Sequence, residues 1–195
     1  ERLESGKNSF DAPLYDSYIT HWLHNVSQDS VVNMLRDKGL NNSEDDKVKV
    51  VFVPCYLDGN DGIMNMTYYD IMPGNDICVF ASYYEPWGYT PLESVAFHVP
   101  TITTDLAGFG LWVEGLKTVK GIDDGVEVVH RSDYNYFDVA QEVEETIFKV
   151  SQKSEKEMDT LRRKATAVAD KALWKNFITY YEEAYDIALR KASER

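Results

Sequence analysis

The chain has 195 residues, of which 44% are hydrophobic and 27% charged, so it can build a folded core and lacks the composition of a disordered protein. Its 33 acidic and 20 basic residues give a net charge of −13, which would repel a phosphate backbone and argues against nucleic-acid binding. The longest stretch without a charged side chain, residues 17–28, is largely polar. Because a membrane-spanning helix needs about 20 apolar residues, we expect no membrane partner.

The pattern of apolar residues predicts alternating helices and strands. In chain order we expect a helix over 30–38, a strand over 48–53, a helix over 65–71, a strand over 77–81, a helix over 91–97, strands over 99–103 and 126–129, and helices from 137 to the end. Short apolar strands that alternate with helices indicate βαβ units. The predicted fold class is therefore α/β, with a Rossmann-like parallel sheet followed by C-terminal helices.

Two of the early elements carry specific expectations. In the first helix, Val31, Met34 and Leu35 share one face, and Gly39 marks its end. Residues 48–53 are β-branched and almost continuously apolar, which predicts a strand buried on both faces. The cluster at 58–62 contains two glycines and predicts a turn.

The cysteines and the start of the chain indicate a cellular setting. Cys55 and Cys78 both lie in apolar segments, and two cysteines make no disulfide framework, so we expect buried free thiols in a reducing compartment. The chain begins at Glu1 without a methionine or an apolar signal sequence. We therefore expect a fragment of a longer cytoplasmic protein.

One loop, residues 82–93 with the sequence SYYEPWGYTPLE, carries most of the candidate chemistry. It follows a predicted strand and leads into a helix, which is where parallel α/β sheets bind ligands. Thr90 is a favoured N-cap residue, Pro91 suits the first helical position, and Thr90 with Glu93 forms a capping box. Gly88 would let the backbone approach a ligand, and the start of the helix would attract a phosphate.

The plain alternative is that Thr90 and Glu93 only cap the helix, with Glu85 a solvated loop carboxylate. The loop also places aromatic side chains next to these carboxylates, a combination that is typical of sites that bind a sugar or a ribose. We therefore interpret the loop as a binding site.

Glu85 and Glu93 have the spacing of the E-x7-E pair found in retaining glycosyltransferases with two Rossmann lobes. The whole string at 82–93, together with TDLAGFG at 104–110, closely resembles the glycogen synthase family of animals and fungi, of which bacterial members are known. Shorter matches are Thr20-His21, residues 29–31, residues 47–52, Pro100-Thr101, residues 173–175 and Tyr180-Tyr181. The resemblance covers nearly the whole chain, and we expect a C-terminal fragment of a bacterial-like member.

The resemblance implies roles for individual residues. Glu85 would lie beside the glucose of the donor, and Glu93 would hold the ribose hydroxyls of the nucleotide. Tyr68 matches the tyrosine that stacks on the uracil ring, although a core aromatic is the ordinary interpretation of such a residue. Residues 108–110 would form a neighbouring loop without assigned chemistry. Gly88, Tyr89 and Thr90 would present backbone and hydroxyl donors to the distal phosphate and the sugar. Trp87 is also expected to be a substrate-binding residue.

The resemblance also implies an organisation and an activity. Residues 1–136 would form part of the nucleotide-sugar-binding donor lobe of a GT-B glycosyltransferase, and residues 137–195 a helical extension packed on it. The activity would be transfer of glucose from UDP-glucose to the 4-hydroxyl of an α-1,4-glucan with retention, without a metal or cofactor. The partners would be UDP-glucose, the glucan and an N-terminal lobe outside this chain, so the isolated chain is expected to be inactive. Apolar residues spaced along the last helix, from Trp174 to Leu189, predict a packing face and possible homo-oligomers where it is exposed.

Basic side chains for the diphosphate are missing from the loop region, because no Lys or Arg occurs between residues 50 and 114. The resemblance implies that an upstream segment supplies them. Residues 154–171, where eukaryotic members carry an arginine-dense regulatory helix, hold fewer basic residues and are interpreted as a solvated helix face. Two alternatives stay open: another retaining sugar-nucleotide glycosyltransferase, and a non-catalytic module that binds a nucleotide sugar or a glucan.

Overall fold

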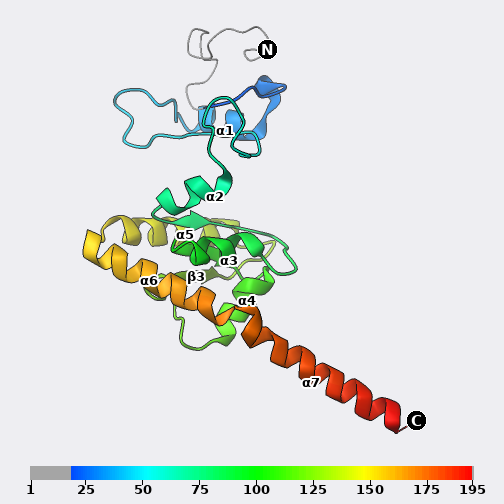
Figure 1. Cartoon of the computed structure of the whole chain (residues 1–195). Helices are drawn as coiled ribbons and strands as arrows, with labels where there is room; N and C mark the ends of the chain where they lie inside the picture. The colour runs from blue at the N-terminus through cyan, green and yellow to red at the C-terminus, as the bar shows by residue number, and fades with distance from the viewer. Residues whose placement is uncertain (1–18, 195) are drawn as a thin grey trace. The chain divides into compact units, whose positions relative to one another are not determined.

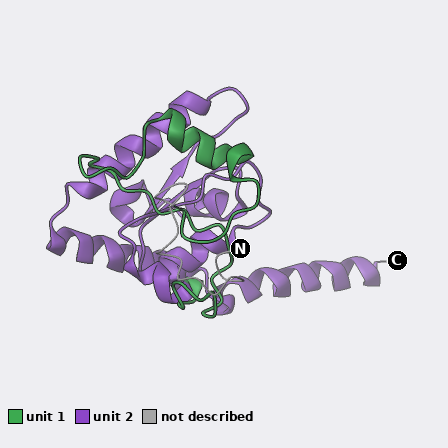
Figure 2. Ribbon diagram, turned by 90° about the horizontal axis from the view of Figure 1, so that it is seen from above, with its two compact units in different colours: residues 1–68 green, residues 69–195 purple. Residues whose placement is uncertain are grey.

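The computed structural model describes residues 19–194 (Figure 1). The chain divides into two compact units, residues 1–68 and 69–195 (Figure 2). The first 18 residues of the expected donor lobe lie outside the described part, and the expected boundary at residue 136 stays a prediction. None of the helices formed by residues 19–194 combines the length and the apolar character needed to cross a membrane.

The first unit is built around helix α1 (Ser30–Asp37), which follows the short 3-10 helix η2 (Val26–Gln28). The Asp29 carboxylate caps α1 by accepting hydrogen bonds from the first free N–H groups, and Gly39 ends the turn after it with a φ of 69°. The buried face carries Val32 and Leu35. The expectation for Val31 and Met34 was wrong, since both are exposed. Residues three positions apart share a helix face, and the face that is buried here is the one with Val32 and Leu35.

The strand expected over residues 48–53 does not form. Among the described residues, this segment pairs only through one parallel bridge between Phe52 and Ile19, and Val48 and Val51 are exposed. A strand needs a neighbouring strand along its length to satisfy its backbone groups, and one bridge does not provide it. The turn at 58–62 is confirmed, with positive φ angles at both glycines.

The second unit contains a three-stranded parallel sheet with the order β1-β2-β3, so the α/β class is confirmed. The strands are β1 (Cys78–Val79), β2 (Thr101–Thr104) and β3 (Val126–Val129). The helices are α2 (Tyr68–Ile71), which begins at the last residue of the first unit, η3 (Met72–Gly74), α3 (Tyr89–Ala96), α4 (Gly108–Gly115), η4 (Ile122–Asp124), α5 (Tyr136–Ser151), α6 (Glu155–Lys171) and α7 (Trp174–Ser193). In this order α3 connects β1 to β2, and α4 and η4 connect β2 to β3.

Helix α4 begins at Gly108, so residues 108–110, where a loop was expected, form its first turn. Phe109 and Val113 are fully buried in the core, with the i, i+4 spacing of one helix face. Gly108 begins the helix in close contact with the loop before α3: a Cβ atom on it would lie 2.3 Å from the carbonyl oxygen of Pro86. Residues 108–110 therefore form the start of a helix that packs against the candidate loop.

The main core of the second unit joins α3, α4 and β3 to α6. Its buried residues are Val95, Phe109, Val113, Val126, Ala165, Val168 and Ala169. Because α6 supplies three of them, this C-terminal helix takes part in the same core as the sheet. Helix α7, in contrast, has no buried residue and extends away from the other helices of its unit in Figure 1.

The two cysteines are less buried than expected. Cys55 is exposed, because the strand predicted to precede it does not form, and Cys78 is half-buried on the edge strand β1. Both thiols are free, and partial burial raises the pKa of Cys78 above its ordinary value.

Candidate active site at the carboxyl ends of the strands

Glu85 lies in the loop that leaves β1, and the backbone of this loop is fixed to the segment that leaves β2. The Glu85 N–H donates to the carbonyl of Leu106 at 3.2 Å, and its carbonyl accepts from the N–H of Gly108 at 3.1 Å. Its half-buried carboxylate accepts from the Ser82 hydroxyl at 3.3 Å. The loop thus presents this carboxylate from a backbone paired on both sides.

The helix after this loop begins earlier than expected. Gly88 is the N-cap residue of α3, with a φ of 102°, and Tyr89 is the first helical residue. Thr90 is therefore the second residue and Pro91 the third, so the expected N-cap and the capping box with Glu93 were wrong. Glycine accepts the positive φ, and a proline in the first turn removes an N–H that has no acceptor within the helix. The N–H groups of Tyr89 and Thr90 remain at the helix start.

Glu93 is freed from capping and makes a different contact. Its Oε1 accepts a hydrogen bond from the Tyr69 hydroxyl at 3.0 Å. The Tyr69 ring stacks on Phe97, with a centroid distance of 5.4 Å and an interplanar angle of 18°. The hydrogen bond to Glu93 raises the pKa of Tyr69 above its ordinary value. The interpretation of Glu93 as a plain helix cap is thereby overturned.

Tyr69 was not among the predicted site residues, although the preceding Tyr68 was. The signal available in the sequence was the tyrosine pair itself, on a short predicted helix. Tyr68 begins α2 and belongs to the first unit, so its stacking on uracil stays a prediction.

The segment from residue 50 to 114 contains no Lys or Arg, but Arg131, from another part of the chain, contacts the loop after β1. Arg131 follows β3, is only 7% exposed, and its Nη1 donates to the carbonyl of Ala81 at 2.6 Å. Its guanidinium carbon lies 3.6 Å from the centroid of the Tyr83 ring, a cation–π contact. Its Nε is buried without a hydrogen-bond partner among the described residues. Because parallel strands end at one edge, a residue after β3 reaches the loop after β1, and that topology was the missed signal.

Asp105, directly after β2, connects the end of that strand to the end of β3. Its Oδ1 accepts from the backbone N–H of Arg131 at 2.9 Å, and its Oδ2 forms an ion pair with His130. The hydrogen bond and the negative charge of Asp105 raise the pKa of His130 above 6.5. The three strand ends are therefore joined by side chains as well as by the backbone.

Trp87 anchors the loop to the core. Its ring lies 6.1 Å from Phe109, 6.0 Å from Trp112 and 5.6 Å from Phe177 of α7, measured between centroids. Phe177 is thus the point where the last helix contacts the site loop, and the expected packing face is confirmed there. Elsewhere on α7, Trp174, Tyr181 and Leu189 are exposed.

Gly88 is needed for packing within the protein. A Cβ atom there would lie 3.1 Å from Cγ of Pro91 and 3.4 Å from Cβ of Phe109, and the positive φ disfavours any other residue. The close approach that Gly88 permits in this structure is to protein atoms, and its expected contact with a ligand stays a prediction.

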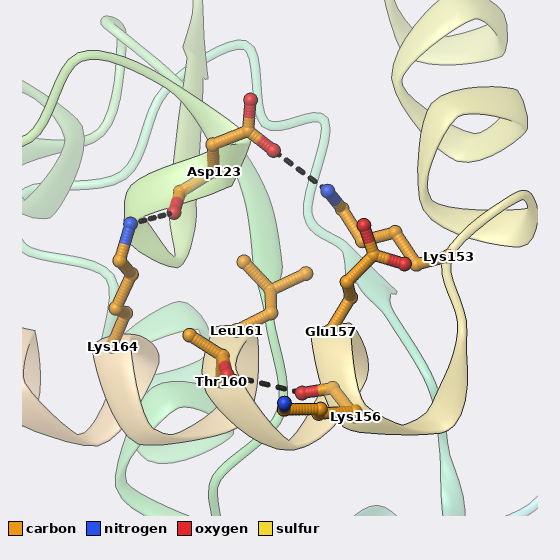
Figure 3. A pocket seen from close by; sticks show the side chains of 7 residues that line it. All are labelled: Asp123, Lys153, Lys156, Glu157, Thr160, Leu161 and Lys164. Carbon is orange, nitrogen blue, oxygen red and sulfur yellow. Dashed lines mark hydrogen bonds and ion pairs between the residues drawn. The ribbon is translucent and has the colours of Figure 1, made fainter.

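A second charged region, an open pocket of about 500 Å³, lies between η4 and α6 (Figure 3). Lys153 donates to the Asp123 carboxylate at 2.8 Å and Lys149 donates to it at 2.5 Å, while Lys164 contacts Asp124 at 3.1 Å. The two lysines lower the pKa of Asp123 to about 2. Neighbouring carboxylates thus neutralise these three lysines, of which only Lys164 belongs to the expected solvated face over residues 154–171. Residues 19–194 hold no group of three or more His, Cys, Asp or Glu side chains placed to bind a metal ion.

Comparison with known proteins identifies the family. The family model for glycogen synthase matches residues 12–195. The chain is 36% identical to a glycogen (starch) synthase of Neurospora crassa, 32% to isoform 1 from Saccharomyces cerevisiae and 30% to the liver protein of Mus musculus, each over 89% of this chain. It spans about a quarter of the length of these relatives, 24–25%. The chain therefore belongs to the glycogen synthase family.

Proposed function

We propose that this chain is the donor-binding part of a retaining glycosyltransferase that transfers glucose from UDP-glucose to the 4-hydroxyl of an α-1,4-glucan. The observation that carries the proposal is the placement of the E-x7-E pair. Glu85 lies in the loop after β1 and Glu93 on the helix that follows, with the start of that helix between them. Membership of the glycogen synthase family gives this pair its chemical context.

In the proposed complex each part of the donor meets a group suited to it. The diphosphate lies at the start of α3, where the N–H groups of Tyr89 and Thr90 and the helix dipole favour an anion. The ribose hydroxyls donate to Glu93, the glucose lies beside Glu85, and the uracil stacks on Tyr68. Trp87 contributes mainly by holding the loop, because its ring packs among core aromatics.

The proposed reaction requires positioning and charge stabilisation more than covalent catalysis. The bond between C1 of glucose and the UDP oxygen breaks, and the 4-hydroxyl oxygen of the acceptor bonds to C1 on the same face. The acceptor proton passes to the departing phosphate oxygen. Glu85 stabilises the positive charge that develops on the glucose ring, while the helix start stabilises the negative charge on UDP. The acceptor site lies in a lobe outside this chain.

The test compares the full-length protein with its Glu85→Gln variant, measuring glucose incorporation into glycogen from UDP-glucose and UDP binding by calorimetry. We expect kcat to fall about 100-fold or more, as for loss of a group that stabilises a transition-state charge, while UDP affinity changes less than about 2-fold. Full activity in the variant would contradict the role of Glu85. Absence of transfer by the wild type, with UDP still bound, would favour a non-catalytic module.

We also propose a cellular location for the protein and a contact for helix α7. We place the protein in the cytoplasm, and we expect the exposed apolar part of α7 to contact another lobe of the same protein or a second copy. Size-exclusion chromatography with light scattering of the full-length protein measures whether two copies associate.

A further inference from the structure

We propose that Tyr69 is a positioning residue that orients the Glu93 carboxylate to receive the ribose of a nucleoside diphosphate. This inference rests on the proposed function, because it assigns to Glu93 the ribose hydroxyls as ligands. It adds a residue outside the E-x7-E loop, from helix α2, to the machinery that selects the donor.

The geometry of the carboxylate is the first argument. The Tyr69 hydroxyl donates to Oε1 of Glu93 at 3.0 Å. A carboxylate accepts through both oxygens, and a donor fixed on one of them sets the rotation of the group. With Oε1 held by the protein, Oε2 is left to accept from a ribose hydroxyl. A hydrogen bond to a charged acceptor is stronger than one between neutral groups, so it can hold this orientation on a half-buried side chain.

The second argument is that Tyr69 is itself held in place by the helix that carries Glu93. Its ring stacks on Phe97, four residues after Glu93 and so on the same side of α3. The Phe97 N–H continues the helical bonding by donating to the Glu93 carbonyl at 2.9 Å. The ring and the hydroxyl of Tyr69 thus contact one face of α3 at two points one turn apart.

The third argument concerns protonation. Tyr69 can donate only while its hydroxyl is neutral, and the neighbouring carboxylate raises its pKa above the ordinary value of 10. The phenol therefore stays a donor over the whole physiological range. The hydrogen bond is a constant feature of the site that a change of pH near 7 leaves intact.

The experiment separates the ribose from the rest of the nucleotide. Calorimetry on the full-length protein measures the affinity for UDP and for 2′,3′-dideoxy-UDP, which lacks both ribose hydroxyls. The variants are Tyr69→Phe, which keeps the stack on Phe97 and removes only the hydroxyl, and Glu93→Gln. The matched control is Tyr134→Phe, the same substitution at a side chain that is 96% exposed.

We expect Tyr69→Phe to bind UDP about 5-fold more weakly and dideoxy-UDP within about 1.5-fold of the wild type, since one hydrogen bond to a charged group is lost. Glu93→Gln should follow the same pattern with a loss of about 10-fold for UDP. Tyr134→Phe should change neither affinity.

The other outcomes overturn distinct statements. If Glu93→Gln discriminates between the two ligands and Tyr69→Phe leaves both unchanged, the positioning role fails and the proposed function stands. Tighter UDP binding by Tyr69→Phe also overturns the inference, because the tyrosine would then compete with the ribose for the carboxylate. Equal weakening of both ligands by Tyr69→Phe places Tyr69 at another part of the nucleotide. If Glu93→Gln weakens neither ligand, Glu93 does not hold the ribose, and the donor site proposed above fails with the inference.

Discussion

At the carboxyl ends of the strands, the cation of Arg131 is 7% exposed and bound to a backbone carbonyl and an aromatic ring. Beside α6, Lys149 and Lys153 are paired with the carboxylate of Asp123, whose side chain is 54% exposed. The first arrangement fixes the backbone of a loop, whereas the second neutralises charge in contact with water. The difference indicates that Arg131 at the strand ends is a structural part of the site, and that the charges of Asp123 and its two lysines belong to a solvated surface.

Gly108→Ala should disturb the strand ends most. The new Cβ atom would lie 2.3 Å from the Pro86 carbonyl oxygen and 3.1 Å from the Trp87 Cα, both backbone atoms of the site loop. We expect a loss of about 2–4 kcal/mol in the free energy of unfolding, measured by urea titration.

Gly115→Ala, on the same helix, is the matched control, because a Cβ atom there meets nothing within 4 Å. It should be neutral or stabilising by about 0.5 kcal/mol. Similar losses in the two variants would show that the loop does not depend on the close approach of α4.

Arg131→Met should have the next largest effect. It leaves the Ala81 carbonyl without its donor and removes the cation from the Tyr83 ring, for an expected loss of about 1–3 kcal/mol. Urea titration measures the stability, and kcat should fall more than UDP affinity because the Glu85 loop loses its support.

Arg190→Met removes an exposed arginine from the last turn of α7 and should stay within about 0.5 kcal/mol of the wild type. An Arg131→Met variant as stable as Arg190→Met would remove the distinction between the buried and the exposed cations.

Asp123→Asn tests the exposed ion pairs beside α6. The folded-state pKa of Asp123, about 2, lies below the ordinary value of 3.8, so its ion pairs stabilise the fold above that value and less as the pH falls toward 2. Since the pairs are exposed and screened, we expect less than about 1 kcal/mol at pH 7.

Urea titrations of wild type and Asp123→Asn in low and high salt measure the contribution of these ion pairs to the free energy of unfolding. This contribution should be smaller in high salt. A large, salt-independent loss would mean that the α6 pocket is as rigid a part of the fold as the strand ends.

His130→Gln should give the smallest effect and a distinct pH dependence. Asp105 raises the folded-state pKa of His130 above 6.5, so the contribution of the protonated ring is fully present below about pH 6.5 and is lost as the pH rises through the folded pKa. The Tm difference between wild type and variant should be about 1–2 °C at about pH 5.5 and vanish near pH 8.5. A difference that grows with pH would have the wrong sign for this pair.

The sequence predicted the parts of this fold that depend on local pattern. The order of the strands in the second unit follows from alternating apolar segments, as do its α-helices apart from α4. The pairing of Glu85 with Glu93 follows from motif spacing. The exact start of α3 did not follow, because Thr90 and Pro91 fit the ordinary capping rules two residues too late, and Gly88 took the N-cap position through its positive φ. Local helix propensity does not depend on the packing of Phe109 against that glycine, which is a tertiary contact.

The missed residues depend on tertiary structure. Arg131 reaches the loop after β1 from 50 positions along the chain, and Tyr69 reaches Glu93 from 24. Neither spacing forms a motif, and both contacts exist only once the sheet and α2 are assembled. The strand expected over 48–53 failed for the same reason, since its apolar pattern was suitable and its partner along the whole length was absent from the described residues.

We propose that the donor nucleotide binds at the carboxyl ends of the strands, and a crystal structure of the full-length protein with UDP would show where it lies. We expect the diphosphate at the start of α3, the ribose hydroxyls on Oε2 of Glu93 and the Tyr69 hydroxyl still on Oε1. UDP bound in the pocket beside α6, or a ribose without contact to Glu93, would contradict it.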